Sequence, residues 1–429
     1  MISLGTLKEM AEKCVRCGIC QSVCPVFAEL QREASVARGK IHLSRNILEG
    51  QIGYSAKLST YLLQCLGCGA CSENCPNGVQ ADQIILAMRA HMAEEKGLSL
   101  PKWLIFRVAF RSVHLLPMLL RPGSLLQGLA LKKIPGESGL HLRFSLPYLD
   151  KNRLIPPIVT PFFLKRFPEE IKGVADANGQ RRIGIFSGCS INYLFPPIGE
   201  AALHLLRRKD FSVIVPKEQT CCGLPAYGSG DIETARLLAR RNLEVFSRRG
   251  IDSLLVPCDS CFYFLKEGYL RLFPQDEKVR AFSQRIIHPS TLFADLRFSI
   301  DRRKSDRARS GQDHPCRLTY HDPCHLRRGM KIFREPRKLL QSLPGVELVE
   351  MKQPDRCCGM GGSFNLVYYP LSRRILRHKL EDIEAVKPDA VVTGCMGCLI
   401  QLRDGLHQKA TATKAMHLME VLEKTLPLT

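Results

Sequence analysis

The stretch Cys14–Pro25 reads CVRCGICQSVCP, and the stretch Cys65–Pro76 repeats its pattern as CLGCGACSENCP. Both follow the spacing C-x2-C-x2-C-x3-C-P, which is typical of bacterial two-cluster ferredoxins. Three thiolates on one tight loop can bind three irons of a [4Fe–4S] cube, and the fourth cysteine then binds the other cube. Zinc sites usually combine paired C-x-x-C units. Two complete runs with the terminal proline therefore favour iron–sulfur clusters over zinc.

These two runs predict two clusters that exchange their fourth ligands. The first cluster is expected on Cys14, Cys17, Cys20 and Cys75. The second cluster is expected on Cys65, Cys68, Cys71 and Cys24. Small residues inside the runs would let backbone N–H groups approach the inorganic sulfur and tune its potential; they are Gly18, Gly67, Gly69 and Ala70.

Ten further cysteines form an internal repeat in the second half of the chain. In each copy a single cysteine precedes a CCG triplet and then a C-x-x-C pair. The first copy holds Cys189, Cys221, Cys222, Cys258 and Cys261, and the second holds Cys324, Cys357, Cys358, Cys395 and Cys398. Five cysteines are one more than a simple cubane needs, and adjacent cysteines can bind different irons of one cluster, with Gly223 or Gly359 relieving the crowding. We therefore predict one or two further iron–sulfur clusters, of cubane or non-cubane type.

Short β-rich runs alternate with helical patterns in both copies of the repeat. The runs are Ile183–Ser187, Phe211–Val215, Ser253–Pro257, Leu318–His321, Val346–Val349 and Ala390–Thr393, and the helical patterns include Gly199–Arg208 and Thr234–Arg248. This alternation indicates βαβ units with a parallel sheet. The cysteines then lie at the carboxyl ends of the strands, where ligand sites gather. The expected fold is a helical two-cluster ferredoxin domain followed by a duplicated α/β, parallel-sheet cysteine-rich domain.

Cysteine spacing and composition divide the chain into five segments. They are a ferredoxin-type domain at 1–95, a helical basic connector at 96–180, a first CCG domain at 181–300, a polar linker at 301–315 and a second CCG domain at 316–429. The apolar window Trp103–Leu120 in the connector contains Arg107, Arg111, His114 and Pro117. A central arginine costs roughly 2.5–3.5 kcal/mol on insertion, which argues against a transmembrane span. A basic amphipathic helix lying on a membrane is the alternative to a packed connector.

Composition also bears on location and partners. The chain has 429 residues, 19 cysteines and a net charge of +21. The odd cysteine count, the C-x-x-C runs and the absence of an apolar signal segment in MISLGTLKEMAEK predict a cytoplasmic protein whose thiolates are bound to metal. The positive charge suits an acidic partner or an anionic membrane surface, with peripheral attachment at its inner face. Nucleic acid ranks last as a partner, because no basic motif with interleaved aromatic residues is present.

Five residues at the start of the second copy are interpreted separately from its cysteine pattern. Cys316 lies outside both cysteine patterns and is predicted to be an ordinary core or linker thiol. His321 and His325 flank Cys324 in the sequence YHDPCHL; they could donate to cluster sulfurs or carry protons, or they could be structural. Asp322 and Pro323 are expected to shape the turn.

The sequence lacks the motifs of an organic redox cofactor. No G-x-G-x-x-G follows a strand, and there is no Walker A or H-E-x-x-H motif. We therefore expect no flavin or NAD on this chain and assign no catalytic residue. A chain with several clusters and no organic cofactor usually serves a flavoprotein partner.

The layout resembles a known family over nearly the whole chain. Two ferredoxin motifs followed by two CCG domains resemble the iron–sulfur subunit of glycolate oxidase and its relatives in FAD-linked D-lactate dehydrogenases. The segment Ala37–Gly50, ARGKIHLSRNILEG, and the segment Cys221–Gly230, CCGLPAYGSG, are similar to stretches of these proteins. The resemblance implies a separate FAD subunit that oxidises the 2-hydroxy acid. Electrons would pass through this chain to quinone or another acceptor.

Two other families share the layout. The chain also resembles the iron–sulfur component of anaerobic glycerol-3-phosphate dehydrogenase and the CCG component of heterodisulfide reductase. The latter implies a catalytic role, in which five-cysteine sites cleave a disulfide. Glycolate oxidase subunits can have a degraded C-x-x-C pair in the first CCG domain, whereas Cys258 and Cys261 are intact here. The lactate-type and heterodisulfide-type interpretations therefore stay open.

Overall fold

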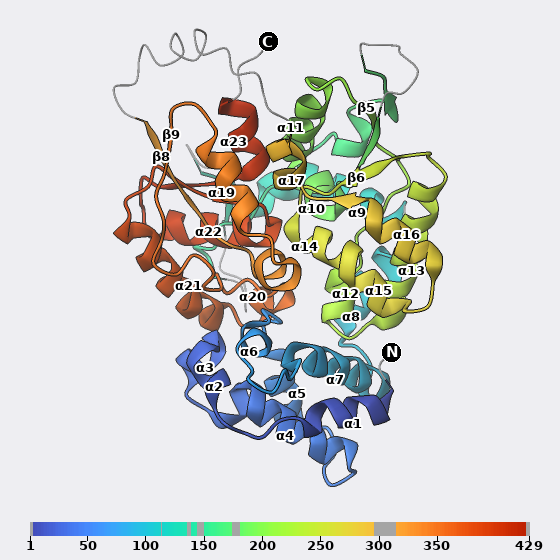
Figure 1. The fold of residues 1–429 in the computed structure, drawn as a ribbon, viewed down its shortest axis with the longest axis vertical. Helices are drawn as coiled ribbons and strands as arrows, with labels where there is room; N and C mark the ends of the chain where they lie inside the picture. Colours follow the sequence, from blue (N-terminus) through green and yellow to red (C-terminus); the bar gives the residue numbers. More distant parts are fainter. Residues whose placement is uncertain are drawn as a thin grey trace.

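The structure is a computed structural model that describes residues 3–112, 114–134, 139–143, 150–173, 181–295 and 315–425. Figure 1 shows three lobes: a helical N-terminal lobe in blue, a first α/β lobe in green and yellow, and a second α/β lobe in orange and red. The two α/β lobes lie side by side above the helical lobe. The mixed helical and parallel-sheet fold agrees with the fold class predicted from the sequence.

The N-terminal lobe is built from short helices around the two ferredoxin-type loops. Its helices are α1 (Leu4–Glu12), α2 (Ile19–Val23), α3 (Pro25–Leu30), the 3₁₀ turn η1 (Glu33–Ser35), α4 (Ala37–Leu48), α5 (Ala56–Leu63), α6 (Ala70–Glu73) and α7 (Ala81–Lys96). Buried apolar residues such as Leu7, Ile41, Ile84 and Met88 join the longer helices in one core. Because α2 and α6 each begin directly after a left-handed glycine, the chain can turn sharply between consecutive cysteines.

The connector is helical in its first part only. It forms α8 (Leu100–Trp103), the π-helical turn η2 (Leu104–Ala109) and α9 (Leu115–Ala130). It then forms a two-stranded antiparallel ribbon of β1 (Leu131–Lys133) and β2 (Leu140–Leu142), the turn η3 (Phe163–Lys165) and the strand β3 (Glu170–Ile171). The prediction of a helical connector is therefore wrong beyond α9. Prolines 156, 157 and 161 explain part of this, because proline removes a donor and favours extended backbone.

The first α/β lobe contains a five-stranded sheet. Its strands are β4 (Arg182–Ile185), β5 (Ser212–Ile214), β6 (Ser253–Leu255) and β7 (Ile286–Ile287), in the order β3-β5-β4-β6-β7, and only the β3–β5 pair is antiparallel. The intervening segments are α10 (Gly188–Tyr193), α11 (Pro196–Arg207), α12 (Leu224–Gly228), α13 (Ile232–Ser247), α14 (Asp259–Tyr263), the π-helical turn η4 (Phe264–Gly268), α15 (Tyr269–Leu272) and α16 (Glu277–Arg285). The helix α17 (Pro289–Asp295) follows β7. The edge strand β3 comes from the segment predicted as connector.

The second α/β lobe repeats this arrangement. Its sheet has the order β11-β10-β8-β9 with all pairs parallel, and its strands are β8 (Cys316–Tyr320), β9 (Val346–Leu348), β10 (Ala390–Thr393) and β11 (Lys414–His417). The helical segments are η5 (His325–Gly329), α19 (Arg334–Gln341), α20 (Ser363–Val367), α21 (Tyr369–Ala385), α22 (Met396–Gln408) and α23 (Leu418–Thr425). All six predicted strand runs overlap observed strands, whereas β3, β7 and β11 were not predicted.

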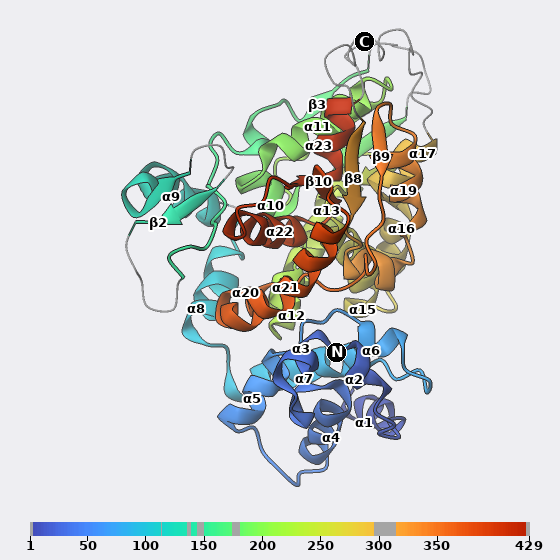
Figure 2. The ribbon, with the colours of Figure 1, turned by 90° about the vertical axis from the view of Figure 1, so that its left-hand side faces the viewer.

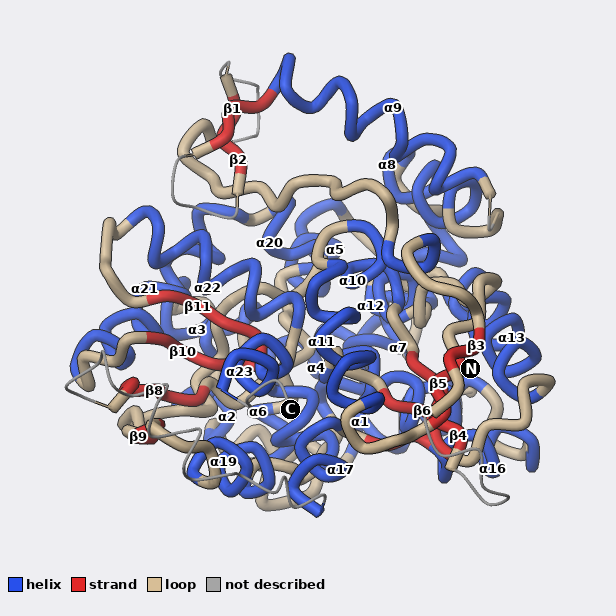
Figure 3. Tube along the Cα trace, turned by 90° about the horizontal axis from the view of Figure 1, so that it is seen from above, coloured by secondary structure: helices blue, strands red, loops and turns tan. Residues whose placement is uncertain are grey.

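The two sheets share one hydrophobic core. Figure 3 shows the two groups of strands on opposite sides of the molecule, with α11 and α23 between them. Leu206 of α11 and Leu422 of α23 belong to the same buried cluster, together with Ile183 and Val391 from the two sheets. Burial of a leucine side chain stabilises a fold by about 1.5–3 kcal/mol, so this contact fixes the two lobes against each other.

The remaining expectations from the sequence concern the linker between the two α/β lobes, Cys316 and a membrane span. Residues 301–314 of the predicted linker lie outside the described residues. Cys316 is the first residue of β8 and is exposed, so it is neither a core nor a linker thiol. Among the helices of the described residues, none combines the length and the apolar character needed to cross a membrane.

Candidate iron–sulfur sites

The cysteines of the N-terminal lobe surround two cavities. Cys14, Cys17, Cys20 and Cys75 line the first cavity, which Cys71 also touches. Cys24, Cys65, Cys68 and Cys71 line the second. The last cysteine of each run therefore lies beside the first three cysteines of the other run. The loops that carry the cysteines pass through left-handed backbone at Gly18, Gly67 and Gly69, while Ala70 is the buried first residue of α6.

The chemistry of these cavities suits a metal cluster. All 19 cysteines lie in the described residues and all are free. Burial raises the pKa of the Cys24 thiol to about 11, and burial next to Cys65 and Cys68 raises the pKa of Cys71 well above its usual range. A thiol of this kind loses its proton readily only when a cation replaces it. Four sulfur donors around each cavity therefore fit an iron–sulfur cluster.

The first CCG site lies at the carboxyl ends of β4, β5 and β6. Cys189 is in α10, Cys221 and Cys222 precede α12, and Cys258 and Cys261 flank the start of α14. Neighbouring thiols interact in the sequence Cys189–Cys221–Cys222–Cys261–Cys258, and hydrogen bonds from Cys221 and Cys261 lower the pKa of Cys222 to about 6. The structure thus brings together all five cysteines predicted for this site.

Polar side chains hold the CCG loop of this first site. Asn242 donates to the carbonyl oxygen of Cys221 at 3.0 Å and accepts from the Thr220 amide at 2.9 Å. The hydroxyl of Tyr269 donates to the carbonyl oxygen of Cys222 at 3.1 Å. Gly223 has φ of +97°, a backbone conformation that L side chains rarely adopt. The sequence did not single out Asn242 or Tyr269, because both lie on helices that carry no cysteine.

The second CCG site has the same layout at the ends of β8, β9 and β10. Cys324 precedes η5, Cys357 and Cys358 lie between β9 and α20, and Cys395 and Cys398 flank the start of α22. Cys357 interacts with Cys324 and Cys358, and Cys398 interacts with Cys358 and Cys395. Hydrogen bonds from Cys258 and Cys398 hold the pKa of Cys395 well below its usual range. All five cysteines of this copy are therefore also brought together.

The two CCG sites meet each other. The thiols of Cys258 and Cys395 interact, and the amide of Asp259 donates to the carbonyl oxygen of Gly394 at 3.0 Å. The Ser260 hydroxyl lies 3.1 Å from the Cys395 sulfur and 3.0 Å from Nδ1 of His325. His325 in turn stacks on Tyr263, with ring centroids 4.8 Å apart. The repeat pattern alone did not reveal this contact between its two copies.

A cysteine of the ferredoxin-type lobe contacts the second CCG site. The thiol of Cys68 interacts with that of Cys357. Next to this contact, Arg328 binds Glu73 of the N-terminal lobe at 3.1 Å and Asp355 at 2.9 Å. The cysteines therefore form a series from the first ferredoxin-type cavity, through the second cavity and the second CCG site, to the first CCG site.

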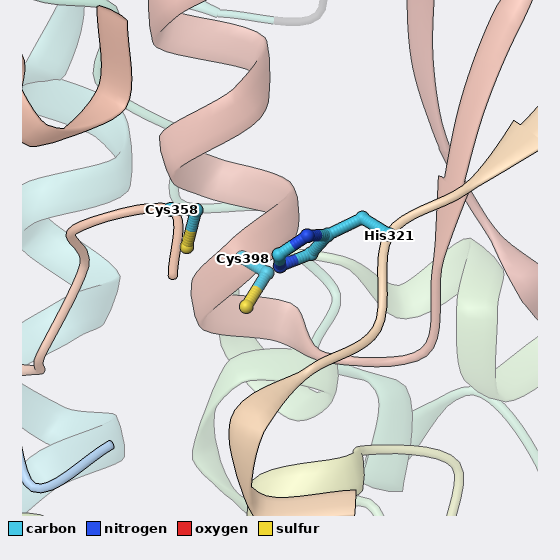
Figure 4. Close-up of side chains that lie close together, drawn as sticks. All are labelled: His321, Cys358 and Cys398. Carbon is cyan, nitrogen blue, oxygen red and sulfur yellow. The ribbon is translucent and has the colours of Figure 1, made fainter. Parts of the chain in front are cut away.

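His321 is buried within the second CCG site. Its ring nitrogen and the sulfurs of Cys358 and Cys398 all lie within 4.8 Å of one another (Figure 4). Burial lowers the pKa of His321 to about 3, so the imidazole is neutral. Asp322 accepts hydrogen bonds from Arg337, beyond the role in shaping the turn that the sequence suggested.

Comparisons with known proteins agree with this arrangement. The chain matches the cysteine-rich domain family, CCG, at residues 183–266 and 318–403, and the 4Fe-4S dicluster domain family at residues 10–79. A crystal structure of a hypothetical protein from Helicobacter pylori aligns over 99% of this chain and 73% of its own, with a TM-score of 0.51 and 9% identity. This likeness concerns the fold alone.

Two curated relatives bear on the family. Lactate utilization protein A from Geobacillus sp. (strain WCH70) is 31% identical over 241 residues, which are 56% of this chain and 98% of that protein. The probable glycolate oxidase iron-sulfur subunit of Bacillus subtilis (strain 168) is 31% identical over 421 residues, which are 95% of this chain and 92% of that protein. The chain therefore belongs to the glycolate oxidase iron–sulfur subunit family of oxidoreductase components, and it carries iron–sulfur clusters.

Proposed function

We propose that this chain conducts electrons from an FAD-containing partner subunit, which oxidises glycolate or D-lactate, to quinone or another acceptor. The observation that carries the proposal is the unbroken series of cysteine sites through all three lobes. Bound clusters supply one-electron transfer at each site. The chain itself holds the sites next to one another and excludes water from most of them, since six of the ten CCG cysteines are buried and the others are half-buried.

The residues proposed to hold the clusters are the eight ferredoxin-type cysteines and the ten CCG cysteines. Cys14, Cys17, Cys20 and Cys75 would hold the first cluster, and Cys65, Cys68, Cys71 and Cys24 the second. The exchange of fourth ligands is supported by the side-by-side placement of each run's last cysteine with the other run. The two five-cysteine groups would hold the further clusters.

The surface around the first cavity suits the docking of the flavoprotein. Cys17 is exposed, and the neighbouring Val15 and Ile19 are large apolar residues with 65% and 46% of their surface exposed. Apolar groups beside a redox centre are typical of surfaces that bind another protein. We therefore propose that the FAD-containing subunit docks at this end of the cysteine series. We also propose that the chain is located in the cytoplasm. Attachment to the inner face of the membrane, where quinone is found, is part of the same proposal.

The test separates the single chain from the complex. The purified chain is mixed with substrate and a dye, with and without the FAD-containing partner subunit. Glycolate or D-lactate should reduce the clusters only when the flavoprotein is present, and a Cys17→Ser variant should impair this reduction. Cys316→Ser is the matched control. Oxidation of either acid by this chain alone would contradict the proposal, and reduction by glycerol 3-phosphate instead would change the substrate class.

A second candidate function is disulfide reduction by the CCG sites. Both sites are complete, and they meet at Cys258 and Cys395. Cleavage of a disulfide needs two electrons and two protons, and two adjacent one-electron sites could deliver the electrons together. The reduced protein should then be reoxidised by a disulfide with release of two thiols. A failure of every disulfide tested, with cubane-only spectra, would remove this candidate.

A further inference from the structure

His321 has an unusual environment for a buried histidine. It follows β8, and its amide donates to the carbonyl oxygen of Val392 at 2.9 Å, which fixes the backbone beside the second CCG site. Its Nδ1 atom is fully buried and has no hydrogen-bond partner among the described residues. Buried polar groups are nearly always paired, so an unpaired one requires a partner that the protein atoms do not provide.

The ring is directed at the sulfurs. Figure 4 shows the imidazole between the strand end and the start of α22, facing the side chains of Cys358 and Cys398. One ligand atom from each of the three residues falls within 4.8 Å of the others, a grouping that could hold a single metal ion. Imidazole is a common metal ligand through either of its ring nitrogens.

The first copy shows that this histidine is not needed by the fold. Phe186 occupies the equivalent place after β4, and its amide donates to the carbonyl oxygen of Leu255 at the same distance of 2.9 Å. Phe186 is buried and offers no donor atom. The same backbone position is therefore apolar in one copy and nitrogen-bearing in the other.

We propose that His321 is a nitrogen ligand of the iron held by Cys358 and Cys398, which gives the second CCG site a mixed sulfur and nitrogen donor set that the first site lacks. Imidazole is a suitable ligand for iron. Replacing thiolate by neutral imidazole raises the reduction potential of an iron–sulfur centre. This inference deepens the proposed function and rests on a cluster being present at the second site, but not on the donor or the acceptor.

The test uses the full chain without any partner. Protein grown with ¹⁵N-histidine is reduced, and electron–nuclear double resonance measures the nitrogen coupling to its clusters. A strong coupling is expected in the wild type and in His325→Phe, and its loss is expected in His321→Phe, which introduces the residue type of the first copy. The midpoint potential of one centre should fall further in His321→Phe than in His325→Phe, because only the first variant removes a ligand atom.

Three outcomes would overturn the inference. They are a wild-type coupling as weak as that of a hydrogen-bonded nitrogen, a strong coupling that persists in His321→Phe, and iron absent from the second site. The wild-type measurement decides the matter even if His321→Phe does not fold. A failure of the proposed electron transfer appears separately, because the resonance experiment needs no flavoprotein.

A second and independent observation concerns the outer face of the connector. None of the residues of α9 is buried. Its exposed positions Met118, Leu119, Leu125, Leu126 and Leu129 fall on one side of the helix by the 3.6-residue period. Leu125 and Leu129 are 82% and 71% exposed. On the opposite side, Gln127 exchanges two hydrogen bonds of 3.0 Å with the backbone of Ile158, so the apolar stripe points away from the protein.

Exposed apolar residues also lie on α8 and η2, which precede α9 in the chain, and the segment as a whole is positively charged. They are Trp103, Leu104 and Ile105. Residues 96–143 contain eight Lys and Arg but one acidic residue, Glu137. Arg107 and Arg111 form ion pairs with α13 and its N-cap, whereas Lys132 and Lys133 are exposed next to α9. Figures 2 and 3 show α9 and the β1–β2 ribbon standing out from one side of the molecule. An apolar stripe with tryptophan and flanking lysines suits the interface of an anionic lipid bilayer.

The inner face of the same segment covers the first CCG site. Ala109, Phe110 and Leu116 line one cavity together with Cys189 and Cys221. A surface bound through α9 would therefore lie directly over the last site of the cysteine series.

The geometry points to α8–α9 as a docking surface for an anionic membrane, which would hold the first CCG site against the bilayer. The charge of this segment argues for lipid rather than for a basic or neutral protein surface. The inference deepens the proposed function, because it concerns where the electrons leave, but its test measures binding alone.

The test is co-sedimentation of the full chain with phosphatidylcholine vesicles, with and without phosphatidylglycerol. Binding is expected only to the anionic vesicles and should weaken with salt. The pair Leu125→Gln/Leu129→Gln should weaken it about tenfold or more. Each of Lys132→Gln and Lys133→Gln should weaken it roughly fivefold. The matched control is Leu366→Gln/Val367→Gln on α20, where exposed apolar residues lie outside the connector.

Three outcomes would overturn the membrane inference. The first is the absence of vesicle binding in the wild type, and the second is equal binding by the connector and control variants. Light scattering that shows a dimer lost in Leu125→Gln/Leu129→Gln would overturn it too, by assigning the face to a second copy of the chain. The iron–sulfur absorbance of each variant shows that its fold and clusters are intact.

Discussion

The two CCG copies have the same architecture but different surroundings. Their sheets share the order β5-β4-β6-β7 and β9-β8-β10-β11, and each places five cysteines at its strand ends. The first copy has Phe186 beside its cysteines and the connector over its outer side, whereas the second has His321 and the ferredoxin-type lobe. Because donor atoms and burial tune an iron–sulfur centre, one duplicated module can provide two redox sites of different potential.

The largest effect on electron transfer through the two copies is expected when one cysteine site is removed at a time. Cys398→Ala should stop electrons passing from the ferredoxin-type lobe to the first copy, because the second copy lies between them. Cys189→Ala should leave reduction of the second copy intact. Freeze-quench electron paramagnetic resonance after addition of a limiting reductant distinguishes the two, with Cys316→Ser as control. Equal reduction of the first copy in Cys398→Ala would contradict the series.

The next largest effect is expected at a buried, hydrogen-bonded pair of side chains in the first copy. Asp259 and His288 are fully buried, 2.7 Å apart, and Asp259 also packs against Gly394 of the second copy. In the second copy Met396 takes the place of Asp259, and His417 lies 3.1 Å from the carbonyl oxygen of Gly394. Asp259→Ala would leave a buried imidazole without its hydrogen-bond partner and should destabilise the fold by about 3 kcal/mol.

Denaturant unfolding of the iron-loaded protein measures this loss. Asp259→Asn is the matched variant, because it keeps a hydrogen-bonding oxygen and removes only the charge. A smaller loss is expected for it. Equal stability of wild type and Asp259→Ala would show that the pair contributes nothing.

The two copies also contact the ferredoxin-type lobe through different residues. The contact of the first copy can be tested by substituting Arg89. This buried arginine of α7 donates to the Leu62 carbonyl oxygen at 2.8 Å and to the Gly228 carbonyl oxygen of the first copy at 2.9 Å. Arg89→Met should leave these carbonyls unsatisfied and cost about 1–3 kcal/mol. Limited proteolysis between the lobes should accelerate.

The matched variant for the second copy is Arg328→Met, which removes the ion pairs to Glu73 and Asp355. Arg328 lies beside two thiols, Cys68 and Cys324, whereas Arg89 lies beside one, Cys65. Arg328→Met should therefore lower the potential of the nearest centre by more than Arg89→Met does. Potentiometric titration separates the two variants. A shift of equal size in both would contradict this difference between the copies.

The smallest effect is expected at Cys316, whose place in the first copy is taken by Arg181. It is exposed at the start of β8, and its amide donates to the carbonyl oxygen of Gly345 at 2.8 Å. Cys316→Ser should change stability by less than about 0.5 kcal/mol and leave the iron content unaltered. Loss of iron in this variant would mean that the repeat pattern omitted a ligand.

The amino-acid sequence alone predicted the separate parts of the molecule. Cysteine spacing and short apolar runs identified both ferredoxin-type runs, the CCG repeat, six strands of the two sheets and the fold class, because each of these follows from local patterns in the chain. The sequence did not identify β7 or β11, which are followed directly by no cysteine, or the two-residue strand β3, which pairs with the edge of the first sheet. It also predicted helix beyond α9, where prolines and pairing with distant residues decide the structure.

Tertiary structure alone decided how these parts meet. The contacts of Cys258 with Cys395 and of Cys68 with Cys357 join residues from different lobes, and no local pattern records them. The same holds for His321. Its sequence neighbours are compatible with several roles, and only the folded structure shows that its ring lies beside the sulfurs of Cys358 and Cys398. Local spacing specifies which groups can bind a cluster, whereas the buried core between the two sheets specifies which clusters become neighbours.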